Sequence, residues 1–439
     1  MLARPLLAAA ALALATASYA APSQVHLGWE GPTDTTMTVT WRSPDPTGQV
    51  IYGTSDAYGE VAAAASIAYG GSWLHEARLT GLSPGTTYHY RAGAGTDLGP
   101  DRTFTTAPAR SARAAFRFAA YGDSRTDDAA RARVRAGVQA RRPAFSVDSG
   151  DLVENGNDQA MWDEWFATME PLLATTPFVS VVGNHEVNSA RFYQQFALPN
   201  RDGSPDTETY ASWDYGNVHF LSLNTEIAYW AGSEQTQWLE ADLAAASADP
   251  RVRWIVAVFH RPPYSSGSHG SNMSVREAWS ALFEKYGVDV VFNGHDHHYE
   301  RSLAFANGVP QRDGAGVVYV VTGGAGAPLY GVSRSDFTAF SRSVHHFVEV
   351  DVTPTTLSLE AIDDTGAVID ALTLRNDAPL PPDDGAGGSG GGSGSGGGGG
   401  AGVAPPVVNA GCGSAGGAAS LASVLALVAA AAGRPRRRR

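Results

Sequence analysis

The chain has 439 residues, of which 43% are hydrophobic and 17% are charged, so it can bury a sizeable core in two or three domains. A formal net charge of −13 excludes a broad basic face, so nucleic acid is not an expected partner, although a local cationic site remains compatible with this charge. The single cysteine, Cys412, cannot form an intramolecular disulfide, so the fold must depend on its core and on any bound metal.

Residues 1–20 have the features of a secretory signal peptide. Arg4 precedes a run of alanine and leucine, and Ser18, Tyr19 and Ala20 form a small-x-small cleavage pattern. A buried first helix is the alternative, but the apolar run is short and Pro22 follows it at once. We therefore expect the protein to be exported.

Residues 23–107 predict an all-β domain. Segments in which apolar and polar residues alternate, such as 36–41 and 86–91, are separated by turn residues. The stretch LTGLSPGTTYHYRAG resembles the E–F region of fibronectin type III domains, including a tyrosine suited to the corner position. This domain carries no candidate chemistry, and we expect it to have a structural or substrate-shaping role.

Residues 114–375 predict strands that alternate with amphipathic helices. Apolar runs such as AFSVDSGD and FVSVVGNHE end in glycine and polar residues. Helices are expected at 127–141, 158–173, 234–246 and 274–286. This alternation is typical of a layered α/β domain, in which ligands collect at the carboxyl ends of the strands.

The polar residues at these strand ends form one set, which we interpret as metal ligands. In chain order they are Asp123, Asp151, Asn184, His260, His295 and His297. Carboxylate, amide oxygen and imidazole suit zinc, iron or manganese, and the lack of thiolate argues against a structural zinc site. Six ligands exceed what one tetrahedral ion needs, so two ions that share a bridging carboxylate fit better. Each residue alone has a plain alternative, as a turn aspartate or a loop histidine, and only the whole series supports the interpretation.

The motifs GDSR, GDLVEN, GNHE, VFHRP and GHDHHYER, in this order and spacing, resemble those of the calcineurin-like metallophosphoesterases. With an all-β domain in front, the chain resembles the purple acid phosphatases. The resemblance implies an α/β fold whose metallophosphoesterase β-sandwich core is flanked by helices. The implied ligands are Asp123 and His297 for the first metal, Asn184, His260 and His295 for the second, and Asp151 as the bridge. His295 and His297 share strand parity, so both can face the site while Asp296 points away.

The resemblance also implies a reaction. Two metal ions would clamp the phosphoryl oxygens and lower the pKa of a bound water, which attacks phosphorus in line as hydroxide. By the same resemblance, His185 stands beside the substrate phosphate and stabilises the transition state. His269 is the candidate general acid, although family members often have paired histidines where this chain continues with Gly270. His298 is a candidate for substrate contact, with a supporting or surface histidine as the alternative.

Two positions depart from the family pattern. Arg125 stands where many members have a histidine, and we expect this cation to contact the phosphate or to form an outward salt bridge. Glu154 stands where purple acid phosphatases have a tyrosine, so Glu154 or water must complete the coordination of the first metal. Because a carboxylate gives no tyrosinate charge-transfer band, we expect a nearly colourless protein. Tyr121 lies one pleat back from Asp123, which is too far to bind the same ion.

The C-terminal part changes composition again. Residues 376–411 form a Gly/Ser/Pro-rich linker that is too poor in apolar residues to fold. Residues 412–439 contain Cys412, an Ala/Leu/Val run and the terminal letters RPRRRR, and they resemble the C-terminal sorting tails of myxobacterial surface proteins. We expect this tail to sort or anchor the protein, with a disordered tail as the alternative. The expected location is the cell surface, the outer membrane or the extracellular space.

These features predict an exported, dinuclear-metal hydrolase of phosphate monoesters that resembles acid phosphatases. A phosphodiesterase is one alternative, because the residues around the first metal are altered. A surface binding protein with a vestigial metal site is the other alternative, and the intact ligand series argues against it. The oligomeric state is not predicted.

Overall fold

The computed structural model describes residues 21–111, 113–201, 208–312 and 316–381. The expected signal peptide and sorting tail lie outside these residues, as does most of the expected linker. Among the helices of the described segments, none combines the length and the apolar composition that crossing a bilayer requires. All described residues belong to one compact unit.

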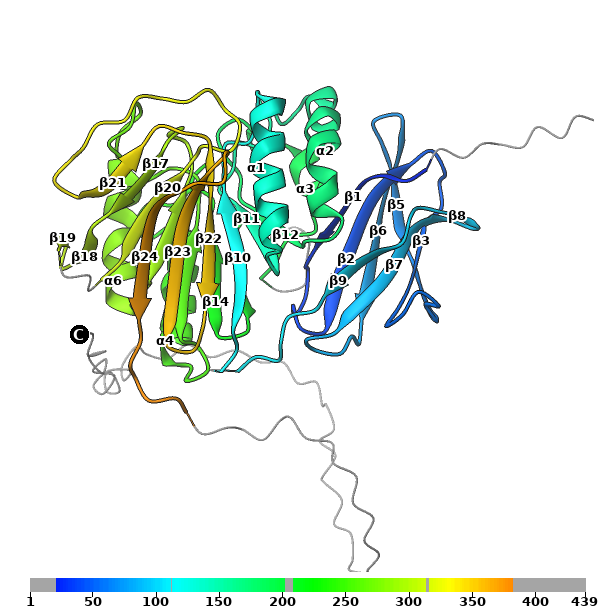
Figure 1. The fold of residues 1–439 in the computed structure, drawn as a ribbon, viewed down its shortest axis with the longest axis horizontal. Helices are drawn as coiled ribbons and strands as arrows, with labels where there is room; N and C mark the ends of the chain where they lie inside the picture. Colours follow the sequence, from blue (N-terminus) through cyan, green and yellow to red (C-terminus); the bar gives the residue numbers. More distant parts are fainter. Residues whose placement is uncertain (1–20, 112, 202–207, 313–315, 382–439) are drawn as a thin grey trace, which may run out of the picture. The chain divides into compact units, whose positions relative to one another are not determined.

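The predicted all-β domain is confirmed, and within the described residues it consists of two antiparallel sheets (Figure 1). One sheet has the order β1 (Ser23–Gly28), β2 (Thr36–Ser43), β6 (Ser72–Thr80) and β5 (Ala65–Tyr69). The other has the order β4 (Glu60–Ala63), β3 (Gln49–Gly53), β7 (Thr87–Ala94) and β8 (Asp97–Leu98), with β9 (Arg102–Thr105) also paired to β7. The corner tyrosine is Tyr88, whose hydroxyl oxygen accepts a hydrogen bond from the Ser83 backbone N–H at 2.9 Å.

The second domain is built on two mixed sheets, which confirms the predicted fold class. One sheet has the order β12 (Phe178–Ser180), β11 (Phe145–Asp148), β10 (Phe116–Tyr121), β22 (His346–Val352), β23 (Thr356–Asp363) and β24 (Val368–Arg375). The other has the order β13 (Ala211–Tyr215), β14 (Val218–Ser222), β15 (Trp254–Val258), β16 (Val290–Asn293), β20 (Val318–Thr322), β17 (Tyr299–Ser302) and β21 (Thr338–Arg342). A short hairpin of β18 (Ala304–Ala306) and β19 (Val309–Gln311) follows β17.

Side-chain alternation along the strands explains why the sheets form layers. In β15, Val256 and Val258 belong to the core between the two sheets, whereas Ile255 and Ala257 belong to a second core beneath helices. Phe118 of β10 packs edge-on against Phe220 of β14, with ring centroids 5.2 Å apart. Strands buried on both faces read as continuous apolar runs, as these do.

The longer helices begin at side-chain caps. α1 (Asp128–Arg141), α2 (Gln159–Leu173) and α4 (Glu234–Ala248) are capped by Asp127, Asp158 and Ser233, close to the predicted starts. A short helix, α3 (Ala190–Gln195), follows β12. The helix predicted at 274–286 is divided into α5 (Met273–Val275), a π-helical turn η2 (Arg276–Ser280) and α6 (Ala281–Tyr286).

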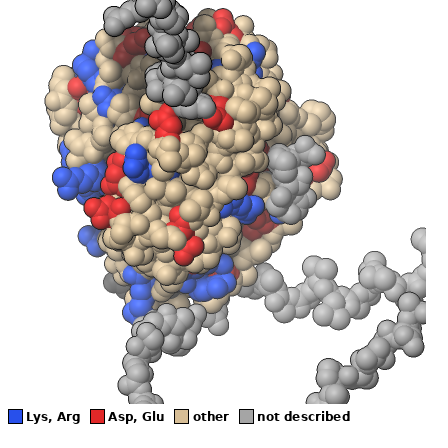
Figure 2. Space-filling model, turned by 90° about the vertical axis from the view of Figure 1, so that its right-hand side faces the viewer, with Lys and Arg blue, Asp and Glu red and all other residues tan. Residues whose placement is uncertain are grey.

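The all-β domain packs against α2 (Figure 1). Arg102 pairs with Glu170 of α2 at 2.8 Å, and Arg42 pairs with Asp163 of the same helix. The Tyr90 hydroxyl donates a hydrogen bond of 2.6 Å to the Ala174 carbonyl. On the face shown in Figure 2, basic side chains are interspersed with acidic and uncharged ones, so that face offers no continuous basic surface.

Candidate metal centre

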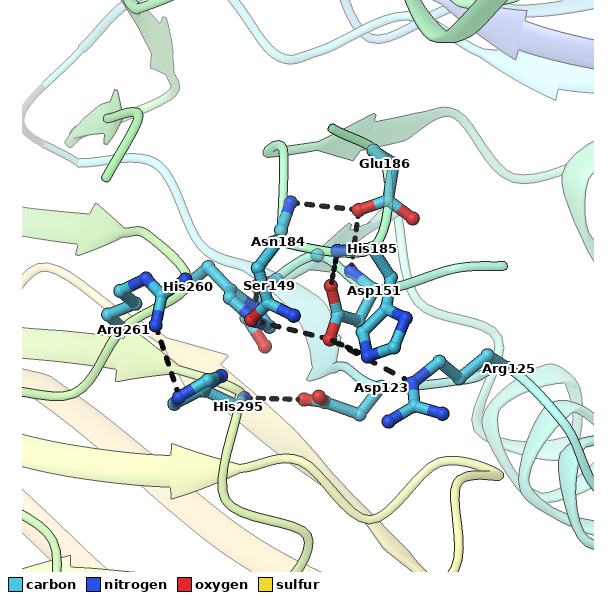
Figure 3. A network of polar contacts seen from close by, with 12 residues as sticks. Asp123, Arg125, Ser149, Asp151, Asn184, His185, Glu186, His260, Arg261 and His295 are labelled. Carbon is cyan, nitrogen blue, oxygen red and sulfur yellow. Dashed lines mark hydrogen bonds and ion pairs between the residues drawn. The ribbon is translucent and has the colours of Figure 1, made fainter. Parts of the chain in front are cut away.

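The six predicted ligands lie together at strand ends of the second domain. Figure 3 shows five of them, Asp123, Asp151, Asn184, His260 and His295, and the sixth, His297, has its Nε2 3.4 Å from Asp123 Oδ1. One sheet supplies Asp123 after β10, Asp151 after β11 and Asn184 after β12; the other supplies His260 after β15, His295 after β16 and His297 before β17. Parallel pairing of β10, β11 and β12, and of β15 with β16, places the carboxyl ends of these strands at the same edge of each sheet.

Three of these residues have a left-handed backbone, which is uncommon outside glycine. The φ angles are 55° at Asp123, 60° at Asp151 and 69° at His295. Such conformations cost on the order of 1–3 kcal/mol each and cluster at functional sites. They turn the chain sharply at the strand end, so that the side chain points across the sheet edge.

Glycines allow the ligand loops to approach one another. A Cβ on Gly183 would overlap the Asp151 carboxylate, and a Cβ on Gly294 would overlap the Asp123 carboxylate. The glycine that precedes the polar ligand in GNHE and GHDHH is therefore required by close approach.

The second-metal position lies among Asp151, Asn184, His260 and His295. The Nδ1–H of His260 donates to the Ser149 carbonyl at 2.9 Å, so its Nε2 faces Asn184 Oδ1 at 3.1 Å and Asp151 Oδ2 at 3.3 Å. Ligand atoms of Asp151, His260 and His295 all lie within 4.8 Å of one another. Carboxylate, amide and imidazole atoms that converge in this way fit a borderline metal ion.

Asp151 and His260 attract each other strongly, so a metal at this position would displace the proton that His260 holds. Burial disfavours the charged forms, but the attraction between Asp151 and His260 raises the pKa of His260 to about 10 and lowers the pKa of Asp151. Burial and the neighbouring charges of His260 and Arg261 lower the pKa of His295 to about 2, so its imidazole is neutral, as metal binding requires.

The first-metal position, among Asp123, Asp151 and His297, has a different character. Asp123 Oδ1 is buried, accepts no hydrogen bond from the described residues and lies 3.4 Å from His297 Nε2. Arg125 occupies the same place: its Nη2 lies 3.4 Å from His297 Nε2, its Nε lies 3.8 Å from Asp151 Oδ2, and it forms an ion pair with Glu154. The acceptors at this position fit a metal, but a guanidinium already lies against them.

His185 and His269 flank the ligands. His185 Nδ1–H donates to the Glu154 carbonyl at 2.8 Å, which directs Nε2 towards Asp151 Oδ2, 3.8 Å away. His269 is exposed, and its ring stacks on His295 with centroids 4.3 Å apart. Both predicted catalytic side chains therefore lie beside the ligand cluster.

His298 does not reach the site. Its side chain has no exposed surface, and its Nε2 lies 3.2 Å from Glu300. A fully buried ring that faces a carboxylate cannot contact a substrate, so this burial contradicts the predicted role of His298. Glu154, by contrast, is half exposed, and its carboxylate pairs with Arg125.

Tyr121 lies away from the ligands, as expected. Its hydroxyl hydrogen-bonds Ser146 Oγ at 3.2 Å, and its ring stacks on Phe178. Burial raises the pKa of this phenol, so the hydroxyl stays protonated.

Sequence reasoning assigned no role to two residues of the site. Glu186 is fully buried and accepts hydrogen bonds from the backbone N–H groups of Gly183, Asp151 and Leu152 at 2.8–2.9 Å. Its place in the motif GNHE was a signal that could have identified it. Tyr330 stacks on His297, with centroids 4.0 Å apart, but no local motif marks it.

Comparisons with known proteins agree with this geometry. Residues 22–106 match the family model of the purple acid phosphatase N-terminal domain, and residues 116–299 match that of the calcineurin-like phosphoesterases. Mouse acid phosphatase type 7 is 30% identical over 353 residues, which cover 70% of this chain and 78% of the mouse protein. An uncharacterised Mycobacterium tuberculosis protein is 29% identical over 330 residues, covering 63% of this chain and only 61% of that protein. The solved structure of a yellow lupin purple acid phosphatase superposes with a TM-score of 0.73 at 22% identity, covering 81% of this chain and 74% of the lupin chain.

Proposed function

Because this chain belongs to the purple acid phosphatase family of calcineurin-like phosphoesterases, we propose that it is a metal-dependent hydrolase of phosphate monoesters. The family implies a phosphate ester substrate and a dinuclear metal centre. The observation that carries the proposal is the convergence of Asp151, Asn184, His260 and His295, drawn from both sheets, on one position. Iron, zinc and manganese suit this set of donor atoms.

The chemistry that a bound metal supplies is Lewis-acid polarisation of the phosphoryl group and acidification of water. The chain's own residues position these partners. Glu186 holds the Asp151 loop by accepting its backbone N–H groups, and the Ser149 carbonyl fixes the tautomer of His260. These contacts preorganise the ligands before substrate arrives.

His185 is placed to stabilise negative charge on the substrate. Its Nδ1–H is committed to the Glu154 carbonyl, so Nε2 donates a hydrogen bond to a phosphate oxygen only in the imidazolium form. A fixed cationic donor beside the developing charge lowers the barrier by electrostatic preorganisation. His269, which is exposed and stacked on His295, is placed to protonate the leaving alcohol.

Two measurements test the proposal. Purified protein is analysed for bound metal, and its turnover of an aryl phosphate monoester is compared with that of the matching diester. We expect Asp151→Ala to lose metal and turnover together, because its carboxylate faces both metal positions. Asp364→Asn, which removes a surface partner of Arg133, is the control and should retain both. Normal metal content and turnover in Asp151→Ala would refute the proposal, and preferential turnover of the diester would assign the site to the phosphodiesterases.

We also propose that the protein is exported and held at the cell surface. This rests on the composition of residues 1–20 and 412–439. Fractionation of cells that produce the full chain tests it, and recovery of the protein with an intact N-terminus in the cytoplasm would contradict it.

A further inference from the structure

We propose that the guanidinium of Arg125 takes the place of the first metal ion, so that this protein binds one metal ion per chain, at the second-metal position. The inference rests on the proposed function for the identity of the site. It departs from the dinuclear centre that the family implies, and it concerns a side chain in which this sequence differs from the family pattern.

The lone pair of His297 carries the first part of the argument. His297 Nδ1 lies 2.7 Å from the Pro328 carbonyl, which only accepts hydrogen bonds, so Nδ1 carries the proton. Nε2 therefore holds the free lone pair, and Arg125 Nη2 donates to it at 3.4 Å. The nitrogen that would bind the first metal already accepts a hydrogen bond from arginine.

Distances show that arginine and metal exclude each other. A metal bound to imidazole sits about 2.0–2.1 Å from the nitrogen. Along the lone pair that faces Arg125 Nη2, 3.4 Å away, such an ion would lie about 1.4 Å from the arginine nitrogen, far inside any contact distance. The first metal can enter only if the Arg125 side chain leaves. At the second-metal position Arg261 Nη1 also lies 3.3 Å from His295 Nε2, but Arg261 is 27% exposed, and its Nε and Nη2 pair with Glu226, which is outside the ligand set, so this side chain can move aside when a metal binds.

Other contacts hold Arg125 in place. Its side chain is only 9% exposed, pairs with Glu154 and lies 3.8 Å from Asp151 Oδ2. That oxygen is also 3.3 Å from His260 Nε2, so the expected bridging carboxylate lies between the guanidinium and the second-metal position. A guanidinium stays charged at all physiological pH values, so it supplies a permanent positive charge where the family has a metal.

Arg125 also borders a cavity, although little of its side chain is exposed. The cavity measures about 470 Å³, and its walls carry both apolar residues, among them Leu152, Met161 and Trp165, and the charged residues Asp128, Arg131, Glu154 and Glu164. The guanidinium thus adjoins both the ligand cluster and a space that can receive the alcohol part of a phosphate ester. Its planar N–H groups suit the oxygens of a phosphate.

Metal stoichiometry of the full chain is the direct test. The protein is stripped with a chelator, reloaded with excess Mn²⁺, freed of unbound metal and analysed for manganese per chain, with electron paramagnetic resonance to separate isolated ions from spin-coupled pairs. We expect one manganese per chain with the spectrum of an isolated ion. Two ions per chain with a spin-coupled spectrum would overturn the proposal.

Substitution of the arginine tests the cause. Arg125→Gly removes the guanidinium, and Arg125→His replaces it with an imidazole. Each substitution should raise the number of metal ions bound per chain from one to two. Arg133→Gln is the control, because the half-exposed Arg133 pairs with Asp364, which is not among the ligands, and its loss leaves the first-metal position closed. Cooperative unfolding of both Arg125 variants would show that they are folded. If these folded variants still bind only one metal ion per chain, the arginine does not exclude the first metal, and the proposal fails.

The outcomes also separate this inference from the proposed function. One ion per chain without turnover of aryl phosphate would refute the function and leave the stoichiometry standing. Turnover with two ions in the wild-type protein would support the function and overturn the role of Arg125.

Discussion

His219 predicts a specific pH dependence of stability, at a distance from the metal centre. Its ring is 7% exposed and lies between two carboxylates, with Nδ1 2.9 Å from Asp214 and Nε2 2.8 Å from Asp242. Burial would lower the pKa of His219, but hydrogen bonds and charge from these aspartates raise it from 6.5 to about 9. Because Asp242 belongs to α4, the imidazolium ties this helix to the hairpin of β13 and β14.

The sign and size of the effect follow from linkage. The folded pKa exceeds the unfolded value, so the stabilisation is complete below about pH 6.5 and disappears as the pH rises through about 9. At about 1.4 kcal/mol per pKa unit, the rise from 6.5 to about 9 corresponds to about 3 kcal/mol. This is a large part of the stability of an ordinary domain.

Urea unfolding of the full chain measures this contribution. We expect the free energies of unfolding of wild-type protein and His219→Gln to differ by about 3 kcal/mol more at about pH 6 than at about pH 9.5. The metal ligands titrate alike in both proteins, so their effect cancels in the difference. His89→Gln, which breaks a partly exposed pair with Asp101, is the control and should differ little from wild type at either pH. If the free energies of unfolding of wild type and His219→Gln differed by the same amount at both pH values, the reasoning would be refuted.

Three further predictions concern the site. His185→Ala should lower turnover about 10²–10³-fold with metal content unchanged, because the ring faces the site without belonging to the ligand set; loss of metal would assign it to the ligands instead. Iron-loaded protein should be nearly colourless, because Glu154 replaces the family tyrosine and the Tyr121 hydroxyl is bonded to Ser146; a strong visible band that disappears in Tyr121→Phe would contradict this. Glu186→Gln should weaken metal binding about 10–100-fold in a titration, because the amide N–H₂ would face backbone N–H groups whose hydrogen bonds the carboxylate now accepts. Unchanged affinity would show that the loop positions Asp151 without Glu186.

The two-domain fold and the convergence of the six proposed ligands could be predicted from the sequence because each of these residues follows a strand rich in buried apolar side chains. The argument from strand parity was less sound. β16 ends at Asn293, and the next residues turn tightly, with the Asp296 N–H donating to the Gly294 carbonyl and the His298 N–H donating to the Asp296 carbonyl. Asp296 does point away from the ligands, towards Ser265 and the backbone of His269, but turns rather than pleating put it there.

Long-range contacts account for what the sequence could not predict. Comparison with the family motif marks Arg125 as a cation in an unusual place, but only the fold shows that its Nη2 lies 3.4 Å from Nε2 of His297, which is 172 residues away in the chain. Likewise, nothing near Tyr330 in the sequence indicates that its ring covers the same histidine. The burial of His298 is a third such case, because it depends on Glu300 and on the packing of β17.

The division of the ligands between two sheets has a consequence for the order of events during folding. Asp151 and Asn184 belong to one sheet, whereas His260 and His295 belong to the other, so neither sheet alone offers a complete set of donor atoms. A metal therefore cannot template the early stages of folding, and it is captured only after the two layers have closed. If the chain is exported unfolded, the metal supply outside the cytoplasm decides which ion the enzyme acquires.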